Sequence, residues 1–121
     1  MARVVLHPLF NATELEKSLA LFNDLAKRAK NGTISDAAFA DAITTKILPP
    51  YAEVRSRLEA VAKRPSPNQN VVVRLVDYMS QREKAWNLYA KALREGDADK
   101  MGRAHEHMRA AEATAKQMSA R

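Results

Sequence analysis

Apolar residues recur at alternating intervals of three and four along most of this chain. The clearest run, interrupted by one arginine, consists of Leu75, Met79, Arg82, Trp86, Tyr89 and Leu93. Such spacing places side chains on one face of an α-helix, and its period of about 3.5 residues is typical of helices that pack at shallow angles. The pattern predicts an all-α protein in which each helix buries one face.

Capping signals divide the chain into four helices. Thr13 opens a capping box, and Ser35 and Asp97 are residue types that accept hydrogen bonds from the first turn of a helix. Gly32 and Gly96 are suited to helix ends, because glycine tolerates a left-handed backbone. We expect helices at residues 13–30, 36–63, 71–95 and 98–118.

Pro49 and Pro50 interrupt the second of these helices. A proline inside a helix removes a hydrogen bond and clashes with the preceding turn. We therefore expect either one helix bent near Leu48, with arms at residues 36–48 and 50–63, or two short helices.

The connections at residues 31–35 and 96–97 are short, so the helices that they join should form hairpins. The expected fold is an antiparallel up-and-down four-helix bundle with a proline bend in its second helix. All 121 residues fit one domain, with an N-terminal extension at residues 1–12 and a proline-rich loop at residues 64–70.

Residue types needed for catalysis or metal binding are scarce. The chain has no cysteine and three glycines, which leaves no thiol nucleophile and no glycine-rich phosphate loop. His105 and His107 point in different directions on a helix, and neither belongs to the inward Glu-x-x-His pair of di-iron bundles. We expect both histidines at the surface, no metal, no cofactor and no enzymatic activity.

The charge balance indicates which kinds of partner the protein can bind. Lys and Arg total 20 against 14 Asp and Glu, a net charge of +6, but acidic residues are interspersed among the basic ones. Nucleic-acid binding calls for a concentrated basic face and is therefore disfavoured. We expect a protein partner or self-association, with an acidic partner or an anionic membrane surface as alternatives.

Arg82 departs from the apolar pattern of its helix. In the interpretation that we favour, its methylene groups cover the core while the guanidinium reaches water. In a second interpretation it forms a buried ion pair with Glu53, Glu59 or Glu112.

A third interpretation makes Arg82 part of an anion-binding groove beside Tyr78 and Tyr89, which lie on the same helix. These three side chains are the candidate binding residues. Aromatic residues at helical spacing are more often core than ligand contacts, and we expect Trp86 to be buried.

Residues 48–121 resemble the helical-hairpin soluble regions attached to bacterial membrane proteins, such as the tails of rhomboid-type intramembrane proteases. The segments that carry the resemblance are LPPY at 48–51, YMSQREKAW at 78–86 and LREGD at 93–97. The chain lacks the Gly-x-Ser-Gly motif of that family, so no catalytic residue can be carried over. The resemblance implies a soluble domain excised from a longer protein.

We therefore predict a non-catalytic interaction or regulatory module, an excised soluble domain of a membrane-associated bacterial protein. The alternative is a small basic helical protein that binds nucleic acid or another anion. The first ten residues lack the long apolar core of a secretory signal, and no apolar stretch is long enough for a transmembrane helix. The compartment stays undetermined, and is cytoplasmic if the chain is full length.

Overall fold

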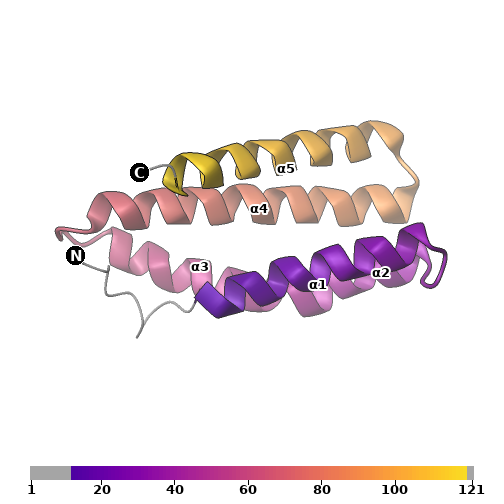
Figure 1. Ribbon diagram of the computed structural model, residues 1–121, viewed down its shortest axis with the longest axis horizontal. Coiled ribbons are helices and arrows are strands. Elements are labelled where there is room, and N and C mark those ends of the chain that lie inside the picture. Colours follow the sequence, from indigo (N-terminus) through magenta and orange to yellow (C-terminus); the bar gives the residue numbers. More distant parts are fainter. Residues whose placement is uncertain (1–11, 120–121) are drawn as a thin grey trace.

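The computed structural model describes the backbone of residues 12–119 and the side chains of residues 16–117 (Figure 1). This part of the chain is helical and contains no strand, so the all-α prediction is confirmed. The helices are α1 (Ala12–Lys30), α2 (Asp36–Ala42), the π-helical turn η1 (Ile43–Ile47), α3 (Leu48–Ala62), α4 (Gln69–Glu95) and α5 (Ala98–Ser119).

The helices form a bundle around α4 (Figure 1). One side of α4 packs on α2, η1 and α3, which form a continuous helical run, and another side packs on α5. Helix α1 packs on the α2–α3 run, and over the described residues its backbone stays more than 8 Å from those of α4 and α5. Among the described helices, α5 therefore packs on α4 only.

Aromatic side chains hold α1, α3 and α4 together. Trp86 of α4 is 0% exposed, because the ring of Phe22 stacks on it at 5.6 Å between centroids and the ring of Tyr51 meets it edge-on at 4.9 Å. Phe22 also contacts Phe39 and Tyr89, at 5.5 and 5.2 Å. Phe22 thus bridges the gap between the backbones of α1 and α4.

A separate seam of alanines joins α4 to α5. Gln81 accepts a 2.9 Å hydrogen bond from the Thr114 hydroxyl, and the ring of Tyr89 contacts that of His105, so later residues of α4 meet earlier residues of α5. This register brings together four buried alanines, each pair spaced seven residues apart: Ala85 and Ala92 with Ala104 and Ala111. Small side chains at this spacing let two helices approach closely.

The helical run continues through the proline pair, so the alternative of two short helices is wrong. The N–H of Leu48 donates to the carbonyl of Ile43, five residues back, and this wider turn precedes Pro49 and Pro50, which have no N–H to donate. The Thr45 hydroxyl donates to a backbone carbonyl of the preceding turn at 2.7 Å. The bend near Leu48 stays a prediction.

Two helices begin earlier than expected. Helix α4 begins at Gln69 instead of residue 71, since the N–H of Val72 already donates to the carbonyl of Asn68. The loop is thus shorter than residues 64–70, and the Gln69 side chain closes it by donating to the carbonyl of Ala62. Helix α1 begins one residue before Thr13, whose predicted cap lies outside the described side chains.

Two predicted N-caps are confirmed. The Ser35 hydroxyl accepts a 3.1 Å hydrogen bond from the N–H of Ala38, and the Asp97 carboxylate accepts one of the same length from the N–H of Lys100. Each cap satisfies a first-turn N–H that has no partner within its helix. The caps fix where the chain turns, and hence how α2 and α5 start against their neighbours.

We predict that Trp86→Ala lowers the free energy of unfolding by about 3–5 kcal/mol, because it leaves a cavity at the centre of the aromatic cluster. Denaturant unfolding followed by circular dichroism measures this change. Val73→Ala on the same helix, at a residue 44% exposed, is the matched control and should change stability by less than about 0.5 kcal/mol. A near-neutral Trp86→Ala would contradict the assigned core.

Candidate binding groove

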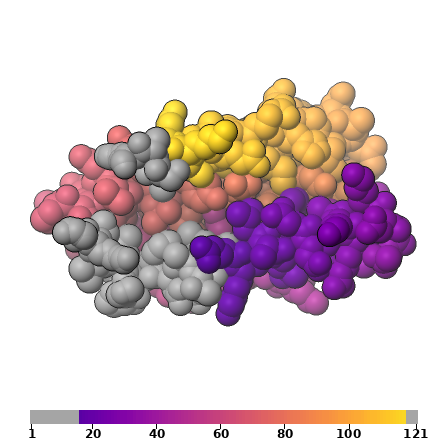
Figure 2. Space-filling view, viewed as in Figure 1, coloured from indigo at the N-terminus to yellow at the C-terminus, as the bar shows by residue number. Residues whose placement is uncertain are grey.

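A groove of about 580 Å³ runs between α1 and α5 with α4 as its floor. In Figure 2 the side chains of α4 are visible between α1 (indigo) and the C-terminal part of α5 (yellow), so the groove opens on this face. It exists because α1 and α5 pack on different neighbours and do not meet. The lining residues are Leu19, Phe22, Asn23, Ala26, Tyr78, Arg82, Tyr89, His105, Met108, Glu112, Ala115 and Lys116.

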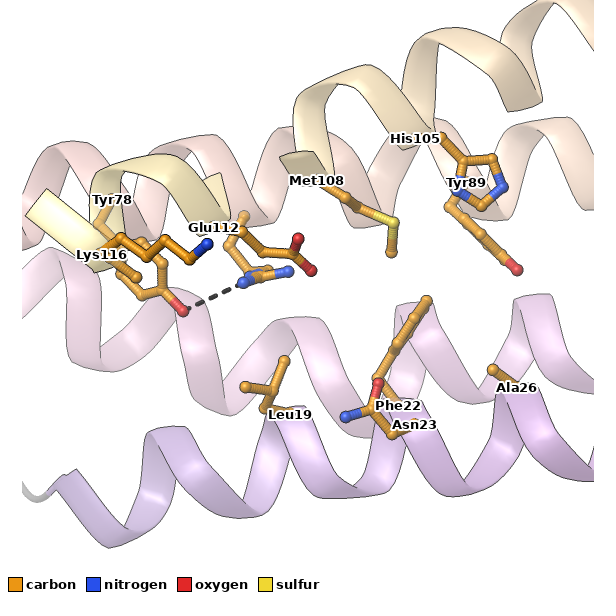
Figure 3. A pocket seen from close by; sticks show the side chains of 12 residues that line it. Leu19, Phe22, Asn23, Ala26, Tyr78, Tyr89, His105, Met108, Glu112 and Lys116 are labelled. Atoms are coloured by element: carbon orange, nitrogen blue, oxygen red, sulfur yellow. Dashed lines mark hydrogen bonds between the residues drawn. The ribbon is translucent and has the colours of Figure 1, made fainter. Parts of the chain in front are cut away.

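All three candidate binding residues line this groove. Tyr78, Arg82 and Tyr89 lie four and seven residues apart on α4, and both tyrosines are half-buried. Figure 3 shows Tyr78 at one end of the groove and Tyr89 at the other. The structure thus brings the three together; whether they bind a ligand stays a prediction.

Arg82 is buried, with only 5% of its surface exposed. Its guanidinium donates a 3.3 Å hydrogen bond to the Tyr78 hydroxyl, drawn as the dashed line in Figure 3. It also lies over the rings of Tyr78 and Trp86, at 5.5 and 5.9 Å from their centroids, where cation–π attraction stabilises it. The favoured expectation that the guanidinium reaches bulk water is therefore wrong, because it lies at the floor of the groove against these two rings.

The second interpretation, a buried ion pair, is not observed in the described part of the chain. No carboxylate there lies within 4.0 Å of a guanidinium nitrogen of Arg82. Glu53 pairs instead with Arg57 at 3.4 Å, and Glu59 with Arg55 at 2.8 Å. Glu112 lines the same groove as Arg82 but is outside this distance.

Several buried polar groups around Arg82 lack a hydrogen-bond partner among the described residues. They are the Nε of Arg82, the Nε1 of Trp86 and the hydroxyl of Tyr51. Burial and the neighbouring Tyr78 hydroxyl raise the pKa of Tyr51, while the charge of Arg82 acts in the opposite direction. Tyr51 therefore stays neutral at physiological pH, and no phenolate is available to balance the guanidinium.

Tyr89 closes the other end of the groove. Burial raises its pKa, and the negative charge of Asp36 raises it further, so this side chain is also neutral. The edge-on contact of its ring with His105 at 5.6 Å places that histidine in the groove wall. His105 is exposed, as expected, but its role in the groove was not anticipated.

The contributions of α1 and α5 to the groove were also missed. Leu19, Ala26, Met108 and Ala115 belong to the apolar stripes of their helices, but they are only partly buried. A stripe reveals which face of a helix is apolar. It does not reveal that the stripes of α1 and α5 face each other across a gap, because that depends on how α4, which lies between them, holds the two helices apart.

A second cavity of about 580 Å³ lies between η1 and α4 and has a basic lining. Lys84, Lys91 and Arg94 line it together with Thr44, Asn87 and Leu88. Arg94 is engaged there, since it donates to Asp41 at 3.0 Å and to the Thr44 hydroxyl at 3.1 Å.

Among the described side chains of residues 16–117, no group of three or more histidines, aspartates or glutamates is arranged to hold a metal ion. None of the described helices combines the length and apolarity that crossing a membrane requires. Comparison of the chain with protein-family models, with curated proteins and with solved structures gives no match.

The α1–α5 groove is therefore an apolar trough with one buried cation at its floor. Exposed polar side chains, among them Asn23 and Glu112, border it. An arrangement of this kind suits a mainly apolar ligand that carries a negative charge.

We predict that Arg82→Met leaves the free energy of unfolding unchanged or raises it by up to about 2 kcal/mol. Methionine keeps an unbranched apolar stem and removes a buried charge that has no carboxylate partner. Urea midpoints of the two proteins test this. A loss of about 3–5 kcal/mol would instead indicate that a carboxylate pairs with Arg82 in solution, and Glu112→Gln, which removes the acid in the same groove, would then cause a similar loss.

Proposed function

We propose that this protein is a non-catalytic interaction module that binds a partner protein in the α1–α5 groove. The observation that carries the proposal is that, among the described helices, only α4 packs on α5, which leaves an apolar groove open beside a buried Arg82 that has no carboxylate partner among the described residues. In a closed bundle, the apolar faces of neighbouring helices are buried against each other. Here the partner would cover the apolar faces of α1 and α5, which do not contact each other.

The lining residues support binding over catalysis. Serine, threonine and cysteine do not occur among them, so the groove offers no aliphatic hydroxyl and no thiol for its histidine to activate; its hydroxyls are the phenols of Tyr78 and Tyr89. On the basis of the resemblance of residues 48–121 to soluble tails of rhomboid-type membrane proteins, we further propose that the module is regulatory and acts beside a membrane-associated protein.

We predict that Ala26→Arg weakens partner binding at least tenfold, because it places a bulky cation in the wall of the groove. Ala60→Arg is the matched control, since Ala60 is exposed on α3 and does not line the groove. A protein captured by the wild-type chain is purified and titrated against the three forms. Equal affinity for all three would contradict the proposed site.

Self-association through the groove is tested with the same variants. Sedimentation equilibrium of the wild type, Ala26→Arg and Ala60→Arg reports whether a second copy is the partner. A dimer that only Ala26→Arg dissociates would identify it.

Binding of a nucleic acid or another polyanion is the second candidate function, favoured by the basic lining of the cavity between η1 and α4. Three basic residues line that cavity, and the logarithm of the affinity should then fall with the logarithm of salt with a slope of about −2.7, at about −0.9 per neutralised phosphate.

We predict no shift in a gel-mobility assay with duplex DNA or RNA at either low or physiological salt. If a shift does occur, Lys84→Ala and Lys91→Ala should each reduce the salt slope by about 0.9. That result would replace the interaction module with the polyanion-binding alternative.

A further inference from the structure

The guanidinium of Arg82 has unused hydrogen-bonding capacity. An arginine carries five N–H donors in a planar fork. Here one hydrogen bond goes to a neutral hydroxyl, Nε has no acceptor, and no described carboxylate lies within 4.0 Å. Aromatic faces offset the charge only in part. The acceptor that satisfies such a fork best is a carboxylate, which takes two of its donors at once.

The shape of the groove specifies an elongated occupant. Its lining residues on α4 extend from Tyr78 to Tyr89, and those on α5 from His105 to Lys116. At a rise of about 1.5 Å per residue, the α4 floor and the α5 wall are each about 16 Å long, or about three helical turns, and the α1 wall from Leu19 to Ala26 is about 10 Å long. The walls are α1 and α5, whose Cα atoms stay more than 8 Å apart over the described residues. The side chains on one face of a third helix can pack into the groove between such walls.

The apolar lining indicates which face such a helix presents. Leu19 and Phe22 on one wall and Met108 and Ala115 on the other are partly or fully buried. In Figure 3 the side chains of Leu19, Phe22 and Met108 reach toward the space between α1 and α5. They fit apolar anchors spaced three or four residues apart on one helix face, the usual mode by which an amphipathic helix binds in a groove.

We infer that the groove binds an amphipathic helix of a partner protein that carries a glutamate or aspartate within its apolar face, and that this carboxylate pairs with Arg82. The inference rests on the proposed function and adds the chemistry of the partner. A buried guanidinium then gives specificity, because a partner helix with an uncharged residue at that position leaves it unpaired.

An isolated carboxylate-bearing small molecule fits the groove less well. Small-molecule sites enclose most of the surface of their ligand, whereas this groove is open along one face of the bundle (Figure 2). A helix covers its own backbone polar groups and needs burial on one face only.

The test is a selection of peptides from a randomised library of helical 16-residue sequences displayed on phage. The wild type, Arg82→Met and Arg74→Met serve as targets; Arg74 is exposed on the same helix and does not line the groove. Only peptides that wild type binds and Ala26→Arg does not are counted. We expect an acidic residue at one fixed position of the apolar face with wild type and with Arg74→Met, but not with Arg82→Met.

Synthetic peptides make the result quantitative. Replacing the selected glutamate by glutamine should weaken binding to the wild type by at least about thirtyfold. The same replacement should change binding to Arg82→Met by less than about twofold, because no buried charge remains to be paired. Arg82→Lys keeps the charge without the planar fork and should retain a reduced preference, which tests the inference even if Arg82→Met does not fold.

The other outcomes overturn one claim or both. Groove-binding peptides with no acidic preference would overturn the role of Arg82 and leave the proposed function standing. Absence of any peptide that Ala26→Arg blocks would overturn both. Decanoate is the small-molecule arm: a saturable rise in melting temperature at micromolar decanoate, absent in Arg82→Met and unaccompanied by peptide binding, would replace the helix by an amphiphilic carboxylate.

Discussion

The contact of Trp86 with Phe22 and Tyr51 is the interaction on which the remaining structure depends. It joins α1, α3 and α4 through rings about 5–6 Å apart, a range in which offset and edge-on pairs attract. Because Phe22 spans the distance from α1 to α4, their backbones need not approach each other. The same ring that closes the core also lines the groove between α1 and α5.

The π-helical turn η1 makes this contact possible. Phe39, Ile43, Ile47 and Tyr51 are all buried, and each is four residues from the next. In a regular α-helix, with 3.6 residues per turn, four-residue steps drift steadily around the axis. The wider turn at residues 43–47 offsets this drift and keeps Tyr51 on the side of Trp86. Intervals of four before a proline pair were a sequence signal for η1 that the capping and proline arguments did not use.

Much of the fold was predictable because it depends on local chemistry. The caps at Ser35 and Asp97, the helical periods and the burial of Trp86 follow from residue types and spacing alone. The burial of the Arg82 side chain does not follow from residue types and spacing. The rings over its guanidinium, Tyr78 and Trp86, lie on its own helix, but whether a long side chain at this position reaches water also depends on how α1 and α5 border that face of α4. The groove was unpredictable for the same reason, since it arises from a gap between α1 and α5.

Arg82 also shows that a residue that suits the proposed groove can be unfavourable for the stability of the bundle. An apolar side chain at that step would continue the stripe of α4 without the cost of desolvating a charge. The alanine seam between α4 and α5 contains no buried charge, because its four side chains are small, buried and uncharged. The unfavourable group thus lies on the one face of α4 that opens into the groove. In the binding that we propose, a carboxylate of the partner would offset the cost of burying this charge, and the same group would make binding at this face selective.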